Sequence, residues 1–256
     1  MSKTYITIST YNESENIKPL ITRIFEVFPQ AHVVVIDDNS PDGTWKIVKE
    51  MAEKDVRVHL IHRTAERGRG SAGIAGFIYA LKEGADYVIE MDADFSHDPI
   101  YIPAFVNCMR DFDLVLGSRF VQGGRDADRG PIRRFVTFLA NLYIRAFLQI
   151  KLHDCSSGFR CFRREVLESV ELEHLISDGP SILQEILFKA CRMEYRIIEI
   201  PIVFVDRKLG KTKLTYRHLI KGFIMVLRLR FDIFPKVKKK CPPQSQTQQE
   251  TIPSGR

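Results

Sequence analysis

Two carboxylates at the end of an apolar run offer the clearest chemistry in this sequence. The segment MDADFSHDP carries Asp92 and Asp94 directly after the apolar run YVIEM. On a turn that follows a buried strand, side chains at positions i and i+2 can converge on one hard cation, and Mg2+ or Mn2+ is commonly held by one or two carboxylates together with substrate phosphates. The same pattern also occurs in ordinary loops and helix caps. We predict a divalent metal site at Asp92 and Asp94. The other motifs of the sequence decide between this site and an ordinary loop.

A glycine-rich segment raises a different possibility. GRGSAG, residues 68–73, matches G-x-G-x-x-G between an apolar run and an amphipathic stretch, and Asp92 stands about where a ribose-binding acid would be. A dinucleotide fingerprint opens the first strand-to-helix turn, whereas these glycines come at the third. Glycines at a helix start also permit a tight turn whatever the ligand. An NAD-binding oxidoreductase is therefore the distant alternative, and absorbance of a bound cofactor would reveal it.

The elements that must position these residues alternate in type. Short apolar runs predict strands, and amphipathic stretches between them predict helices. Strands are expected at 4–9, 32–37, 56–61, 86–92 and 113–118, and helices at 15–28, 43–54, 71–84 and 102–111. This pattern is typical of an α/β fold with a Rossmann-like, mostly parallel sheet flanked by helices. In such sheets ligands bind beyond the carboxyl ends of the strands, where the polar segments of this chain stand.

Length and composition favour one ordered domain. The chain has 256 residues, of which 45% are hydrophobic and 27% charged, with no repeat and no evident linker. We expect a catalytic domain over residues 1–232 and a basic, then polar and disordered tail over 233–256. The N-terminus has no apolar signal region. Five cysteines without a C-x-x-C pair favour neither a disulfide framework nor a zinc site.

The charge is concentrated near the C-terminus. Residues 206–240 hold twelve Lys or Arg and two Asp, a net +10 within a chain of net +6. Such a segment suggests a polyanionic partner, either nucleic acid or an anionic membrane surface, although a solvated basic face has the same composition. The aromatics Phe223, Phe231 and Phe234 have core-like helical spacing instead of forming a stacking platform, so we expect no nucleic-acid binding. A gel shift titrated with salt would test this.

Eight short motifs occur along the chain in the same order as in a known protein family. They are TYNESENI, VIDDNSPDGT, RGRGSAGIAGF, MDADFSHDP, GSRF, SSGFRCFRREVL, QEILFKA and IPIVFVDRKLGKTKL. Through them residues 4–215 resemble the inverting family 2 glycosyltransferases with the GT-A fold, and within that family the branch that transfers mannose from GDP-mannose to dolichyl or polyprenyl phosphate. The resemblance implies that the glycine-rich segment starts a helix beside the nucleotide. A polyprenyl-phosphate glucosyltransferase, or another donor sugar, remains the alternative.

The resemblance also assigns the donor side of a site. It places the nucleotide base and ribose on Tyr11, Glu13 and Asp38. Asp92 and Asp94 become the metal and sugar-nucleotide carboxylates, with Mg2+ or Mn2+ as the cofactor. Ser96 stands where many relatives have Gln and is the third candidate metal ligand. Gln184 and Glu185 look like part of the helix that frames the sugar pocket. An ordinary polar helix face with no binding role would have the same sequence pattern.

The acceptor side is basic. The positions that match the family's phosphate-binding residues are Arg119, Arg133, Thr137, Arg207 and Lys211. Guanidinium groups suit phosphate, although each cation could equally form a surface ion pair. A dolichyl phosphate is already anionic and needs no strong base to attack the sugar, so catalysis consists in stabilising the departing diphosphate, for which we name Asp92, Asp94 and Arg119. Single displacement would convert an α-linked donor into a β-linked product.

Two amphipathic stretches suggest how a lipid acceptor is reached. Apolar residues recur at helical spacing, with basic flanks, near 133–150 and 215–231. Such helices lie in the membrane interface, although two core helices would also fit. No apolar run of about twenty residues predicts a spanning helix. We expect a peripheral protein on the cytoplasmic side of a membrane (the endoplasmic reticulum in a eukaryote) that docks alone or through small membrane-anchoring subunits. A membrane adaptor without catalytic activity is a further alternative, but it would not need the carboxylates of Asp92 and Asp94.

Overall fold

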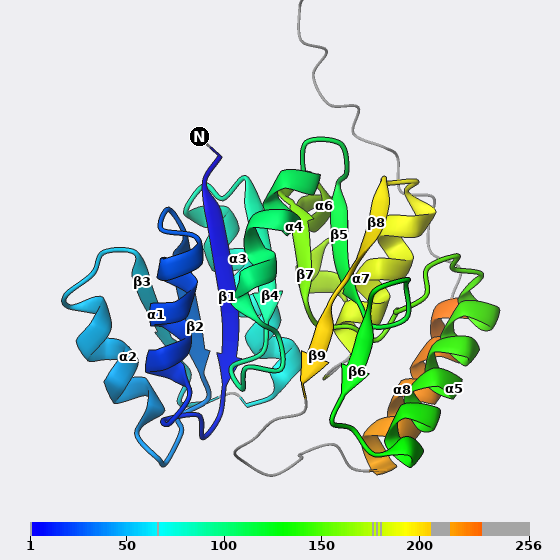
Figure 1. The fold of residues 1–256 in the computed structure, drawn as a ribbon, viewed down its shortest axis with the longest axis horizontal. Helices are drawn as coiled ribbons and strands as arrows, with labels where there is room; N and C mark the ends of the chain where they lie inside the picture. Colours follow the sequence, from blue (N-terminus) through cyan, green and yellow to red (C-terminus); the bar gives the residue numbers. More distant parts are fainter. Residues whose placement is uncertain are drawn as a thin grey trace, which may run out of the picture.

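The computed structural model describes residues 2–65, 67–175, 177, 179, 181–205 and 216–231. Its main feature is a seven-stranded sheet in the order β3-β2-β1-β4-β7-β5-β8 (Figure 1). The strands are β1 (Thr4–Thr10), β2 (His32–Asp37), β3 (Val58–His62), β4 (Tyr87–Met91), β5 (Leu114–Ser118), β7 (Arg160–Arg163) and β8 (Ile197–Pro201). All neighbours are parallel except β7, which is antiparallel to both β4 and β5. The mostly parallel α/β sheet predicted from the sequence is confirmed.

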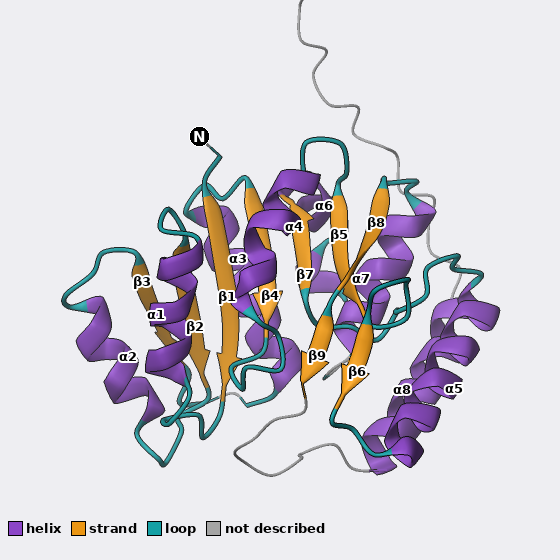
Figure 2. Cartoon of the chain, in the orientation of Figure 1, coloured by secondary structure: helices purple, strands orange, loops and turns teal. Residues whose placement is uncertain are grey.

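Helices cover both faces of this sheet, as Figure 2 shows. They are α1 (Ile17–Val27), α2 (Thr44–Ala52), α3 (Arg69–Lys82), α4 (Ile102–Cys108), α6 (Arg164–Ser169) and α7 (Ser181–Arg192), with 3-10 turns at Pro99–Tyr101 and Leu172–His174. Along β2, Val33 and Val35 pack with α1, α2 and α4, while Val34 and Ile36 pack with α3 and α7. Because alternate residues enter two separate cores, a parallel strand must be apolar throughout. This explains why the run HVVVID could be recognised as a strand.

A second, smaller sheet and a helix pair extend from one end of the molecule. β6 (Arg125–Ala127) pairs in parallel with β9 (Val203–Val205), which follows β8 almost directly. α5 (Pro131–Leu148) and α8 (Tyr216–Phe231) lie side by side (Figure 1). The Tyr143 ring stacks on Phe223 with centroids 4.4 Å apart, and its hydroxyl donates to the Phe223 carbonyl over 3.1 Å. Both amphipathic stretches of the sequence therefore form helices.

No helix in the described part of the chain has the length and apolar character needed to cross a bilayer. Residues 232–256 lie outside the described residues, so the predicted tail at 233–256 and the domain boundary before it stay predictions.

Candidate active site

Asp38 joins the ends of the first strands to the glycine-rich segment. It follows β2, and its backbone N–H donates to the carbonyl of Thr10 at the end of β1 over 3.3 Å. Its buried carboxylate accepts from the Gly68 backbone N–H at 2.7 Å and pairs with Arg63 at 3.1 Å. Gly68 has φ +137°, a conformation that side chains rarely permit. The predicted nucleotide residue Asp38 is thus fixed against the start of α3.

The other two predicted nucleotide residues lie next to Asp38 in the fold. Tyr11 follows Thr10, and the Arg67 guanidinium stands 5.9 Å from the centre of its ring. Glu13 accepts from the Asn16 side chain at 2.9 Å, and its backbone N–H donates to Thr44 at the start of α2. The sequence interpretation missed Arg63 and Arg67, although both stand in RTAERGRG beside the glycines. The structure therefore gathers aromatic, acidic and basic groups at one edge of the sheet.

The turn after β4 holds the predicted metal residues. Ser96 donates its backbone N–H to Asp94 Oδ1 at 3.1 Å, and the Asp92 backbone N–H donates to His97 Nδ1 at 3.0 Å. Buried His97 stacks on Phe159 with ring centres 5.0 Å apart, and burial lowers the pKa of its imidazole. An unprotonated Nδ1 is what acceptance from Asp92 requires. His97, for which the sequence suggested no role, therefore shapes the turn.

The oxygen atoms at this turn suit a hard cation. The Ser96 side chain is buried, and its hydroxyl has no hydrogen-bond partner among the described residues. In the same part of the chain no group of three or more His, Cys, Asp or Glu forms a closed metal cluster. Two carboxylates and an orphaned hydroxyl fit an ion that takes its other ligands from phosphates and water. A groove of about 860 Å³ opens beside Asp94 along α1, lined also by Lys18, Phe95 and Val205.

The starts of α3 and α7 pack tightly beside this turn. A Cβ on Gly70 would lie 2.6 Å from the Gly179 carbonyl oxygen and against the Ile182 side chain. Glycine is therefore needed here for close packing, which accounts for part of the G-x-G-x-x-G pattern. On α7, Glu185 is fully buried, accepts from the Ser177 backbone N–H at 2.8 Å and pairs with Lys189. The partly buried Gln184 keeps Oε1 without a hydrogen-bond partner among the described residues.

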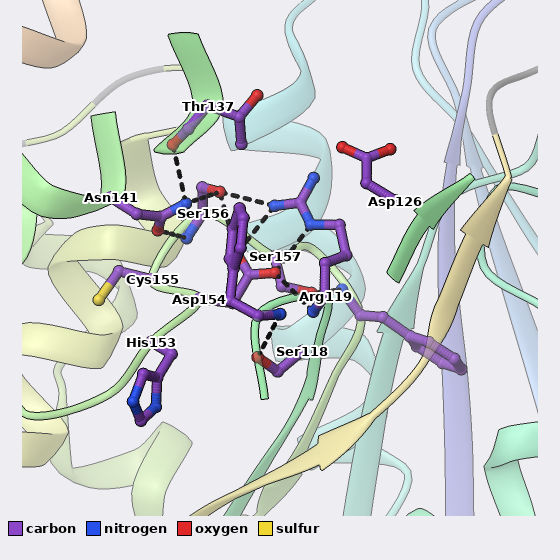
Figure 3. A network of polar contacts seen from close by, with 12 residues as sticks. Ser118, Arg119, Asp126, Thr137, Asn141, His153, Asp154, Cys155, Ser156 and Ser157 are labelled. Carbon is purple, nitrogen blue, oxygen red and sulfur yellow. Dashed lines mark hydrogen bonds and ion pairs between the residues drawn. The ribbon is translucent and has the colours of Figure 1, made fainter. Parts of the chain in front are cut away.

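Arg119 lies at the end of β5 in a buried network (Figure 3). Asp154 accepts from Nε and Nη2 of Arg119, both at 2.8 Å, and from its backbone N–H at 3.1 Å. Burial alone would raise the pKa of Asp154, but the bonds from Arg119 hold it below its usual value. Arg119 Nη2 also donates to the Ser156 hydroxyl at 2.7 Å, so most of its donors already have protein partners.

Two of the remaining predicted acceptor residues, Arg133 and Thr137, belong to α5. Thr137 donates its hydroxyl to the Arg133 carbonyl at 2.9 Å and accepts from Arg129 at 3.4 Å. Arg129 in turn pairs with buried Asp126 at 3.2 Å. The structure thus brings Arg119 and Thr137 into one polar region and adds Arg129, which the sequence interpretation missed. Arg207 and Lys211 lie outside the described residues.

A fold of this kind with these strand-end carboxylates defines a glycosyltransferase of the GT-A type. The family model "Glycosyl transferase family 2" matches residues 5–171, and the chain belongs to that family. The resemblance seen in the sequence is thereby confirmed, and the nicotinamide interpretation of residues 68–73 is not retained.

Individual relatives agree over most of the chain. An undecaprenyl-phosphate mannosyltransferase from Micrococcus luteus is 38% identical over 208 residues, covering 81% of this chain and 86% of that protein. A polyprenol monophosphomannose synthase from Mycolicibacterium smegmatis is 39% identical over 227 residues, covering 88% and 85%. A solved mannosyltransferase from Pyrobaculum calidifontis, in complex with GDP-Man and Mn2+, superposes with a TM-score of 0.57 at 20% identity, covering 88% of this chain and 64% of that one.

Proposed function

We propose that this enzyme transfers mannose from GDP-mannose to the phosphate of a dolichyl or polyprenyl phosphate, with inversion at the anomeric carbon. The names of its relatives support the sugar and the lipid class. The products are a β-linked lipid phosphomannose and GDP, as protein glycosylation or glycolipid assembly would use.

One observation carries the choice of acceptor. The polar region of Arg119, Arg129 and Thr137 includes the face of α5 that carries Thr137, and the other side of α5 is apolar and exposed. The exposed apolar residues of α5 and α8 are Ile132, Phe135, Val136, Phe138, Leu139, Leu142, Phe147, Phe223, Ile224 and Phe231. A molecule with a phosphate head and a long hydrocarbon chain would engage both surfaces at once. We therefore assign the acceptor phosphate to Arg119, Arg133 and Thr137, with Arg207 and Lys211.

The donor occupies the strand ends. Tyr11, Glu13 and Asp38 bind the nucleoside, and Gln184 faces the sugar. Asp92, Asp94 and Ser96 would hold Mg2+ or Mn2+, whose chemistry is neutralisation of charge on a departing diphosphate. The acceptor phosphate oxygen attacks the anomeric carbon, and the bond to the diphosphate breaks on the opposite side. No side chain has to remove a proton, because the nucleophile is an anion already.

The apolar face of α5 and α8 would dock on the membrane surface. Arg134 flanks that face and would contact anionic lipid headgroups at the cytoplasmic side. We propose peripheral attachment, either by this face alone or with small membrane-anchoring subunits, and no nucleic-acid partner. Flotation with vesicles containing anionic lipid tests the surface directly. Phe135→Ser with Phe138→Ser should lose vesicle binding, and Val56→Ser, an exposed apolar residue far from α5 in the sequence, is the control.

The activity is tested by transfer of labelled mannose from GDP-mannose to a polyprenyl phosphate in detergent micelles, with Mg2+ or Mn2+ and with EDTA. Metal-dependent lipid product, lost in Asp94→Ala, is the expected result. Absence of product with GDP-mannose, together with product from a nucleotide-glucose donor, would overturn the choice of sugar. Product that persists with EDTA would overturn the role assigned to Asp92 and Asp94.

A further inference from the structure

An asparagine on α5 stands out because it is buried on a largely exposed helix. The buried residues of α5 are Asn141, Ile144 and Leu148, and Asn141 is 3% exposed. Burying a carboxamide costs free energy unless its donors and acceptor are bonded. The polar contacts of Asn141 therefore show what this position does.

Asn141 is bonded to the loop that follows α5 (Figure 3). Its Oδ1 accepts the Ser156 backbone N–H at 3.1 Å, and its Nδ2 donates to the Ser156 hydroxyl at 3.0 Å. Nδ2 also donates to the Thr137 carbonyl at 3.1 Å, so all its polar hydrogens have acceptors. The Asn141 side chain thus joins its own helix, at the Thr137 carbonyl, to the loop at 153–157.

Ser156 continues the connection to Arg119. Its hydroxyl donates to Asp154 Oδ1 at 3.0 Å and accepts from Arg119 Nη2 at 2.7 Å in addition to Asn141. One donor and two acceptor sites complete the capacity of a hydroxyl. The Ser156 hydroxyl, which lies between Asn141 and Arg119, therefore has its full hydrogen-bonding capacity in use.

We infer that Asn141 is a positioning residue, which with Ser156 sets the register of α5 against Arg119. This inference rests on the proposed function, in which Arg119 and Thr137 both contact the acceptor phosphate. Ile144 and Leu148 also hold α5 to the protein, but apolar contacts are not directional and tolerate sliding. Hydrogen bonds weaken steeply when distance or angle changes, so the Asn141 contacts fix the backbone of α5 at Thr137 relative to Ser156, which in turn contacts Arg119.

The placement has a functional consequence, because α5 is also the helix whose outer face would rest on the membrane. A lipid phosphate would reach the enzyme from that side, while Arg119 directly follows β5 and is held by Asp154. Asn141 and Ser156 connect these two parts and keep the distance between Thr137 and Arg119 constant. Loss of the connection should therefore weaken acceptor use without affecting the donor.

The test compares Asn141→Leu, Ser156→Ala, the double variant and Ile144→Ala. We expect each of the first two to raise the KM for a polyprenyl phosphate about tenfold and to leave the KM for GDP-mannose unchanged. The double variant should raise the acceptor KM by less than the product of the two single effects, because both single changes break the bond from Asn141 Nδ2 to the Ser156 hydroxyl. Ile144→Ala should lower the Tm yet leave the acceptor KM as in the wild type. A normal acceptor KM in Asn141→Leu, or an equal rise in Ile144→Ala, would overturn the inference.

Hydrogen exchange gives a readout that does not need activity. In Asn141→Leu, amides in 137–141 and in 153–157 should lose protection together, whereas Ile144→Ala should leave 153–157 protected. If the wild type transfers no sugar to a polyprenyl phosphate but this joint loss occurs, the proposed function fails and the connection stands. Unchanged exchange at 153–157 in Asn141→Leu overturns the connection itself.

Discussion

Arg69 donates a hydrogen bond from Nη2 to Oδ1 of Asp92, so the first residue of α3 is paired with the first carboxylate of the D-x-D turn. The Arg69 side chain is 43% exposed and can leave this position without disturbing the core. The fields of Asp92, Glu90 and Asp94 raise the pKa of Arg69. The Arg69 guanidinium therefore binds the Asp92 carboxylate, which we assign as a metal ligand.

Removal of this cation should ease metal binding. We predict that Arg69→Gln binds Mn2+ about two- to fivefold more tightly than the wild type in the absence of nucleotide, because an exposed ion pair of this kind contributes at most about 1 kcal/mol. Titration calorimetry with Mn2+ measures it. Arg23→Gln removes a charge from α1 in the groove beside Asp94 and serves as the control. Equal affinities in all three proteins would show that Arg69 does not compete with the ion.

The buried pair of Arg119 and Asp154 should be sensitive to loss of one partner. Asp154→Ala leaves the Arg119 guanidinium buried without its carboxylate, and we predict a loss of about 3–5 kcal/mol in the free energy of unfolding. Urea unfolding followed by circular dichroism gives this value. Glu168→Ala removes a carboxylate from the exposed pair with Arg164 and should change stability by less than about 1 kcal/mol. Similar effects of the two variants would contradict the burial argument.

Stability should fall in mild acid, and two histidines at the other end of the sheet contribute to this fall. Burial lowers the pKa of both His32 and His59 below 6.5, and Lys3 adds to the effect on each. For His32 the charges of His59 and Arg57 act in the same direction, whereas Asp55 opposes them. For His59 the nearby Glu83 opposes the shift.

A group with a depressed pKa in the folded state binds fewer protons there than in the unfolded chain. Its stabilising effect is complete above pH 6.5 and is lost as the pH falls below it. We predict that Tm declines from pH 7.5 to 5.5 and that His59→Gln reduces the decline, while exposed His174→Gln leaves it unchanged. An identical pH dependence in wild type and His59→Gln would rule out this source.

Two glycines of the same motif should respond in opposite ways to substitution by alanine. In Gly70→Ala the new Cβ would meet the Gly179 backbone and Ile182, and we predict a loss of about 1–3 kcal/mol. In Gly73→Ala the nearest atom is Glu90 Oε1 at 3.6 Å, an ordinary contact. Inside α3 this substitution should be neutral or add up to about 1 kcal/mol. Thermal unfolding of both variants decides, and equal losses would contradict the packing argument.

The parallel strands were predictable because each carries its evidence in a local run of apolar residues. β7 was not predicted, since its four residues RCFR include two arginines, and only the central Cys161 and Phe162 face the cores. Buried Arg160 is accepted there because it donates to the carbonyls of Ser157, Leu183 and Cys155. No periodicity in the sequence shows such long-range partners.

The candidate site also has a part that could be predicted from local sequence and a part that could not. Asp92, Asp94 and Ser96 are neighbours in the sequence, so their shared turn could be inferred directly. The partner of Arg119 is 35 residues away, and the sequence contains nothing that pairs it with Asp154. Asn141 was hidden for another reason: it lies in the mostly apolar stretch FLANLYI, and its burial depends on a loop that follows the helix.

The antiparallel strand β7, which lies inside the sheet between β4 and β5, also determines the order in which the sheet can form as the protein leaves the ribosome. β1 to β4 can join as soon as the first 91 residues have emerged. β5 is synthesised next but reaches β4 only through β7, which ends at Arg163. Until then one edge of β4 keeps its backbone groups unpaired, and such an edge invites other chains to add to it. The interval between β4 and β7 is therefore the period in which the nascent protein most needs protection from aggregation.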